Sequence, residues 1–114
     1  GTNMERTDGR SLLPILADNA APWREHLVCE DHGHRIPYGV RMIWWERWKY
    51  VLNGGDIDML YDLEADPHEM HNLIRDEAHA EVLAELRRRM IEHLAETDDT
   101  DWFWEMLLSA PAAY

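Results

Sequence analysis

A short run of thiol, imidazole and carboxylate side chains has the residue types that could bind a metal ion. Cys29, Glu30 and His32 lie within four residues of one another, and His34 follows. Thiolate and imidazole are good zinc ligands. At strict strand alternation, however, Cys29 points away from His32, and no second ligand pair stands at a convincing spacing. We therefore favour ordinary strand and loop residues here over a zinc site, and we predict no metal site in the chain.

A second group with possible chemistry is the acidic cluster Asp98, Asp99 and Asp101. Clustered carboxylates could bind a cation, but no acidic residues in the chain form a spaced loop of oxygen ligands. Carboxylates also favour the free amides and the positive dipole end at the start of a helix. We favour the helix start. We find no set of residues that could serve as nucleophile, general acid and cation together, and we predict no catalytic residue.

The length and net charge of the chain limit the kinds of protein to which these side chains can belong. The chain has 114 residues, of which 46% are hydrophobic, so it should fold as one domain. Its 23 acidic and 11 basic residues give a net charge of -12. Nucleic-acid binding is unfavourable at this charge, and no apolar run reaches the ~20 residues of a membrane span. We expect neither nucleic acid nor membrane as a partner.

The apolar pattern predicts an α+β fold. Alternation predicts four strands at residues 26–31, 39–45, 48–53 and 57–63. The turns Glu46-Arg47 and Gly54-Gly55 are short, which makes the sheet antiparallel. Residues 76–96 have the apolar spacing of a long helix. We expect a lead-in segment at 1–25, a four-stranded antiparallel sheet at 26–63 packed by that helix, and an apolar C-terminal helical tail at 100–110.

Alternation also predicts which side chains the helix covers. We expect one continuous apolar face, made by Val40, Met42, Trp44, Trp48, Tyr50, Leu52, Ile57, Met59, Tyr61 and Leu63. The other face mixes polar residues with Ile43, Trp45, Val51 and Leu60. A sheet face open to water should be polar throughout. We therefore expect the Trp45 face to be covered, either by the C-terminal tail or by another body.

The segment LYDLEADPHEMHNL at residues 60–73 is distinctive, yet it contains no obvious chemistry. Asp66-Pro67 predicts a sharp exit from the last strand, because proline cannot extend the ladder. Glu69 and Asn72 offer side-chain acceptors to free backbone amides near a helix start. The segment is typical of a strand-to-helix corner with structural functions.

Several motifs together resemble a known family. Residues 61–73 fit the pattern Y-D-L-x-x-D-P-x-E-x-x-N-L, and they closely resemble the C-terminal region of type I sulfatases in the alkaline-phosphatase-like superfamily. In the same order, residues 8–16 (DGRSLLPIL), 23–25 (WRE), 30–33 (EDHG) and 47–53 (RWKYVLN) are similar to segments of that region. The resemblance covers about residues 8–98. It implies a small antiparallel sheet with a packed helix.

The resemblance also indicates what is missing. The family's nucleophile is a formylglycine made in a C/S-x-P-x-R motif, and Cys29 lies in V-C-E-D-H, which does not match. The calcium expected in the full-length enzyme is bound by the catalytic domain, so no cofactor is expected in this chain. The resemblance thus implies the non-nucleophilic part of a sulfuric-ester hydrolase, inactive alone and paired with a catalytic domain.

One functional role could still belong to this part. In similar sulfatases the first strand of the C-terminal subdomain approaches the mouth of the active site, which makes Glu30, His32 and Arg41 candidate substrate-binding residues. The alternative for these three is local hydrogen bonding at the sheet edge. The alternative for the whole chain is a free-standing interaction module that self-associates through the Trp45 face and the tail.

Overall fold

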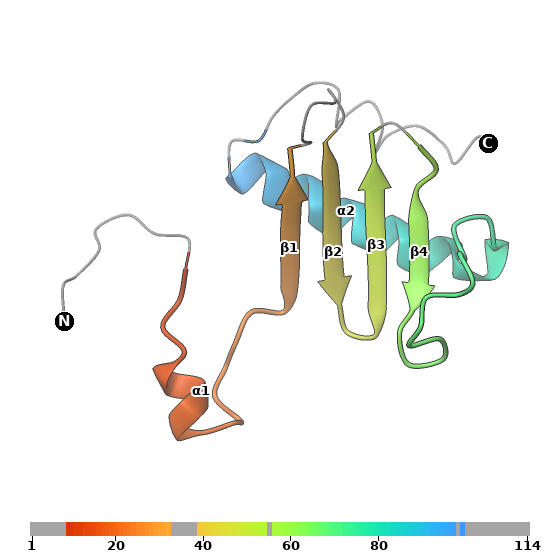
Figure 1. The fold of residues 1–114 in the computed structure, drawn as a ribbon. Helices are drawn as coiled ribbons and strands as arrows, with labels where there is room; N and C mark the ends of the chain where they lie inside the picture. The colour runs from red at the N-terminus through yellow and green to blue at the C-terminus, as the bar shows by residue number, and fades with distance from the viewer. Residues whose placement is uncertain (1–8, 33–38, 55, 98, 100–114) are drawn as a thin grey trace.

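The computed structural model describes residues 9–32, 39–54, 56–97 and 99, and it confirms the predicted α+β fold (Figure 1). Each predicted strand is present and the sheet is an antiparallel meander in the order β1-β2-β3-β4. The elements are α1 (Leu13–Ala17), β1 (His26–Asp31), β2 (Val40–Trp45), β3 (Trp48–Asn53), β4 (Met59–Asp62), the 3-10 turn η1 (Glu77–His79) and α2 (Ala80–Glu96). The predicted tail at 100–110 lies outside the described residues.

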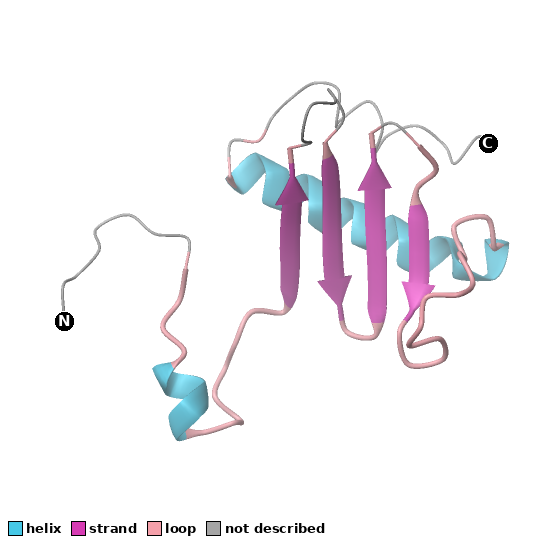
Figure 2. Ribbon diagram, in the orientation of Figure 1, coloured by secondary structure: helices cyan, strands magenta, loops and turns pink. Residues whose placement is uncertain are grey.

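The long helix α2 crosses one face of the sheet, whereas α1 stands apart from it (Figure 2). The segment at 76–96, which we predicted to be one helix, consists of the 3-10 turn η1 followed by α2. Asp76 caps its start, because the side-chain oxygen accepts a hydrogen bond from the amide of Ala78 at 3.0 Å. No helix in the described ranges is long and apolar enough to cross a membrane.

The hairpin between β2 and β3 fixes the register of these two strands. Its two turn residues are Glu46 and Arg47, and the backbone of Glu46 has φ 53°, in the left-handed region. Two-residue hairpins commonly have positive φ at the first turn position, because this matches the twist of the strands. Trp45 pairs with Trp48 across the hairpin. Ile43 therefore lies opposite Tyr50, and Tyr50 lies opposite Leu60.

This register shows that the predicted apolar face was wrong for two of the strands. Directly paired residues point to the same side, so Ile43 and Leu60 join Tyr50 under the helix. Trp45 is on this covered side too, packed against the core, with the guanidinium of Arg89 4.4 Å from its ring centroid. The residues predicted to be covered on β2 and β4 lie on the opposite face: Val40, Met42, Trp44, Met59 and Tyr61.

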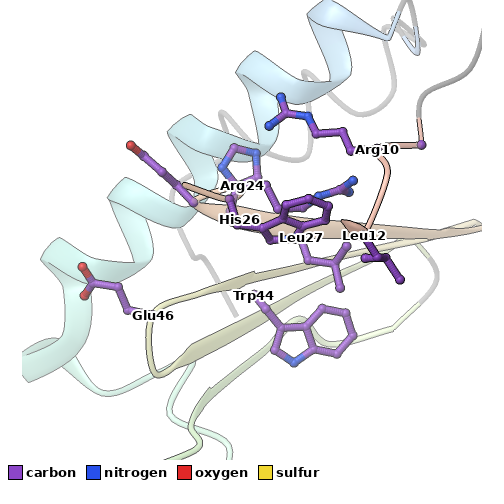
Figure 3. Close-up of a pocket in the computed structure, with 10 residues that line it drawn as sticks. Arg10, Leu12, Arg24, His26, Leu27, Trp44 and Glu46 are labelled. Atoms are coloured by element: carbon purple, nitrogen blue, oxygen red, sulfur yellow. The ribbon is translucent and has the colours of Figure 1, made fainter. Parts of the chain in front are cut away.

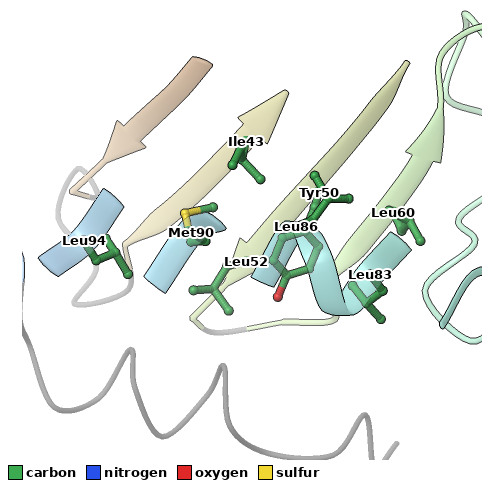
Figure 4. Close-up of a cluster of buried hydrophobic side chains, with 8 residues drawn as sticks. All are labelled: Ile43, Tyr50, Leu52, Leu60, Leu83, Leu86, Met90 and Leu94. Atoms are coloured by element: carbon green, nitrogen blue, oxygen red, sulfur yellow. The ribbon is translucent and has the colours of Figure 1, made fainter. Parts of the chain in front are cut away.

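The core lies between this sheet face and α2 (Figure 4). From the helix it receives Leu83, Leu86, Met90 and Leu94, which recur at helical spacing. From the sheet it receives Ile43, Tyr50, Leu52 and Leu60. Full burial of a large apolar side chain contributes about 1.5–3 kcal/mol. This layer is therefore the main source of stability in the described chain.

The strand-to-helix corner is structural, as its sequence predicts. The side-chain oxygen of Asn72 accepts hydrogen bonds from the amides of Leu60 and Ile74, at 3.0 and 3.1 Å. The side-chain carboxylate of Asp66 accepts a hydrogen bond from the backbone amide of His71 at 2.8 Å. Glu69 differs from the prediction: its carboxylate binds the ammonium of Lys49 at 2.6 Å.

Candidate functional site

The three predicted site residues meet at the end of the β1–β2 pair, and Arg41 is the buried centre of the group. Glu30 and Arg41 are paired across the two strands. Only 2% of the Arg41 side chain is exposed, and its Nη2 lies 2.7 Å from the carboxylate of Asp99. Its Nη1 donates to the backbone carbonyl of Val40 at 3.1 Å. A guanidinium held in this way stabilises the strand ends and has little surface left for a ligand.

His32 is the exposed member of the group. Its side chain is 71% exposed, and its Nε2 lies 3.3 Å from a carboxylate oxygen of Glu30. Its Nδ1 lies 3.5 Å from Nη2 of Arg41. A guanidinium can only donate, so Nδ1 accepts in this contact when the neutral ring carries its proton on Nε2, the nitrogen that faces Glu30. The imidazole is therefore oriented from both sides while one surface stays open to solvent.

Glu30 links this group to the helix. Its second carboxylate oxygen lies 3.9 Å from Nε2 of His93 on α2, while the first faces His32. Carboxylates that orient an imidazole in this way fix its tautomer and ring direction. The arrangement can hold an anionic or hydroxyl-bearing ligand at His32. It offers no nucleophile within the described group.

The zinc arrangement that the sequence raised as an alternative is not formed by the described residues. Cys29 is exposed and points to the sheet face opposite to Glu30 and His32. His34 lies outside the described residues. Within the described ranges no three His, Cys, Asp or Glu side chains are grouped so that they could hold a metal ion.

Asp99 is the member of the site that the sequence did not identify. The carboxylate of Asp99 pairs with Arg41, also accepting from its Nε at 2.8 Å. The helix that we predicted to start at Asp98, Asp99 and Asp101 lies outside the described residues. The other two residues lie outside the described ranges. The only available signal was the acidic cluster itself, because 58 positions separate Asp99 from Arg41.

A second polar network lies between the sheet and α2 and is structural. The hydroxyl of Tyr50 donates to the carboxylate of Asp58 at 2.8 Å, and Arg87 lies 3.4 Å from the same carboxylate. Burial is the main cause that raises the pKa of Tyr50, and the negative charge of Asp58 raises it further. Tyr50 therefore remains a neutral donor under ordinary conditions, unsuited to acid–base chemistry.

Comparisons with known proteins agree on one family. The profile of the family described as N-sulphoglucosamine sulphohydrolase, C-terminal, matches residues 2–96. An uncharacterized protein of Haemophilus influenzae is 29% identical over 107 residues, which are 90% of this chain and 54% of that protein. The multifunctional alkaline phosphatase superfamily protein PehA of Trinickia caryophylli is 30% identical over 116 residues, covering 88% of this chain and 23% of PehA.

The solved structures show the same likeness. The crystal structure of a putative sulfatase from Bacteroides thetaiotaomicron superposes with a TM-score of 0.77 at 27% identity. The match covers 86% of this chain and 22% of that protein. The chain thus spans about half or less of the length of the proteins it matches.

Proposed function

Because the chain belongs to the N-sulphoglucosamine sulphohydrolase C-terminal family and is the C-terminal subdomain of a sulfatase, we propose that it completes the substrate pocket of a sulfuric-ester hydrolase. The observation that carries the proposal is the exposed, doubly oriented imidazole of His32 at the end of β1. The resemblance to sulfatases implies that this strand approaches the active site. The family match over residues 2–96 favours this function over a free-standing interaction module.

The three candidate residues have different functions in this proposal. His32 contacts the substrate, because it is the most exposed of the three and its imidazole can form a hydrogen bond with a sulfate or sugar oxygen. Glu30 orients the ring. Arg41 is a positioning residue, since its guanidinium is buried against Asp99 and the backbone.

The sheet face opposite to α2 is the surface we assign to the catalytic body. It carries the apolar side chains Leu27, Met42, Trp44, Val51, Met59 and Tyr61. The outer surface of α2 carries charged side chains that pair with one another, Arg88 with Glu85 and Glu92. A contiguous apolar surface marks a contact with another body, so the sheet side suits the contact better than the helix side. Trp44, rather than Trp45, is then the tryptophan at the interface.

Catalysis itself is assigned to the rest of the enzyme. The sequence contains no C/S-x-P-x-R motif, so we expect the purified chain to show no turnover of an aryl sulfate. The described residues offer no grouped ligands that fit a calcium ion. The resemblance to sulfatases implies that the calcium is bound by the catalytic body.

The test is a kinetic comparison in the sulfatase polypeptide that includes this chain. His32→Ala should lower kcat/KM for the sulfated substrate about tenfold or more, because one hydrogen bond to a charged group contributes about 1.5–3 kcal/mol. His68→Ala, at an exposed corner position, is the matched control and should leave the kinetics unchanged. Unchanged kinetics in the His32 variant would overturn the proposed contact.

A further inference from the structure

The short helix α1 and the residue before it carry apolar side chains that face water in the described structure. Leu12, Leu13 and Leu16 are 60%, 72% and 79% exposed, and none of the residues of α1 is buried. The run SLLPILA at residues 11–17 contains no charged side chain, although 30% of the chain is charged. Single exposed leucines are ordinary on a protein surface. Three of them on one short segment form an apolar patch, which indicates a contact with another body.

The described part of the chain does not provide the packing that would hold α1 as a helix. Its backbone hydrogen bonds are local, such as the bond from the amide of Leu16 to the carbonyl of Leu12 at 3.0 Å. Isolated helices shorter than about 12–15 residues are marginal in water, and α1 has five residues. Among the described residues, the core cluster and the side chains packed on it include none from α1. The stabilising contact is therefore expected from a partner surface.

A groove connects α1 to the sheet face that we assign to the catalytic body. It has a volume of about 580 Å³, and its lining includes Leu12, Trp23, Leu27 and Trp44. Leu27 and Trp44 belong to that sheet face, and Figure 3 shows Leu12 beside Leu27. Leu12 thus extends the apolar surface from the sheet towards the helix. One partner surface can contact α1 and the sheet face together.

The lengths of the relatives indicate which partner this is. The match covers 22% of the putative sulfatase of Bacteroides thetaiotaomicron and 23% of PehA, so most of each protein lies outside it. The family profile begins at residue 2, so α1 lies within the matched region. An apolar patch inside a sulfatase subdomain, next to the face that contacts the catalytic body, is best covered by the remaining part of the same polypeptide.

We propose that α1 is a docking element, whose leucines are buried in the catalytic body of the same polypeptide. The proposal rests on the pairing of this subdomain with a catalytic domain, and not on the contact of His32 with a substrate. The partner surface is apolar, because residues 11–17 offer no charge to pair with a buried charge. Residues 18–25 then connect a helix held by the catalytic body to a sheet held by α2.

Hydrogen exchange measured by mass spectrometry tests this contact without a substitution. The sulfatase polypeptide that includes this chain is compared with the 114-residue chain alone. The amides of Leu16 and Asp18, which form hydrogen bonds in α1, should exchange at least about tenfold more slowly in the longer protein, because burial protects the helix. The amides around Leu86 and Met90, in the core of α2, should be protected in both proteins and are the control.

Substitutions then test the leucines themselves. Leu13→Asn combined with Leu16→Asn should change the Tm of the 114-residue chain by less than about 1 °C and lower that of the longer protein by several degrees, since only there are both side chains buried. Ile91→Asn is the matched control, because Ile91 is 41% exposed on α2, and it should shift both Tm values equally. If the asparagine pair prevents the longer protein from folding, Leu13→Ala with Leu16→Ala should give a smaller loss of Tm, again in the longer protein only.

Three results would overturn the proposal. Equal exchange rates at α1 in the two proteins would show that the catalytic body does not cover the helix. A lower Tm of the 114-residue chain after the leucine substitutions would show that this chain covers them itself. Self-association of that chain in sedimentation, abolished by the asparagine pair, would identify a second copy as the occupant. Unchanged kinetics of His32→Ala would reject the proposed substrate contact and leave these measurements as they are, so the two failures are distinguishable.

Discussion

The ion pair between Arg41 and Asp99 should be the most sensitive polar contact in the fold. Asp99→Asn removes the carboxylate that pairs with this guanidinium, which is 2% exposed. Removing one partner of a fully buried pair costs about 3–5 kcal/mol. The Asp99 side chain is 21% exposed and Arg41 keeps the carbonyl of Val40, so we expect a smaller loss, about 2–3 kcal/mol.

Urea unfolding followed by circular dichroism measures this loss. Glu92→Gln is the matched control, because it removes the same charge from an exposed pair with Arg88 and should cost under about 0.5 kcal/mol. The control is needed because any lost carboxylate relieves repulsion in a chain of net charge -12. Adding Arg41→Met to Asp99→Asn should recover part of the stability, since the buried charge itself is then removed. Equal, small losses in Asp99→Asn and Glu92→Gln would refute the reasoning.

Two further changes test the strand-to-helix corner. Asn72→Ala removes a side-chain amide that forms hydrogen bonds with three backbone groups, so the free energy of unfolding should fall by about 1–3 kcal/mol in a thermal unfolding experiment. His68→Ala is the control and should leave this free energy unchanged. Equal Tm values for the two variants would contradict this. Hydrogen bonding from Arg47 lowers the pKa of Asp62 to about 2 from its ordinary 3.8. A carboxyl group whose pKa is lowered by folding stabilises the fold at pH values above its pKa in the unfolded chain. This stabilisation is therefore lost as the pH falls from 3.8 to about 2. Asp62→Asn should flatten that part of a plot of unfolding free energy against pH.

The meander and the helix were predictable because their signals are local. Period-two alternation identified each strand, and the apolar spacing of residues 83–94 identified α2. The buried faces of β2 and β4 were not predicted correctly. For β2, the two-residue turn at Glu46-Arg47 would have been enough to predict the buried face. That turn pairs Trp45 with Trp48, so Trp44 must point away from the helix. Alternation within one strand gives two faces, and the pairing with the next strand shows which faces lie on the same side of the sheet.

The candidate site was predictable in part for the same reason. Glu30 and His32 share a side of the extended chain, so their proximity follows from alternation. The burial of Arg41 and its pairing with Asp99 depend on how α2 crosses the sheet. With 23 acidic residues, the sequence offers too many candidate partners for one arginine. Pairing across 58 positions is therefore a property of the packed structure, which short-range patterns do not encode.

The corner at residues 60–73 influences the site without contributing a residue to it. Its polar side chains bind backbone amides or neighbouring cations, which fixes where the chain leaves β4 and where α2 begins. The rotation of α2 about its axis is set by its own buried residues Leu83, Leu86, Met90 and Leu94, which pack on the sheet. That packing brings His93, in the last turns of α2, to 3.9 Å from a carboxylate oxygen of Glu30. The corner therefore acts on the site only through the position at which α2 begins.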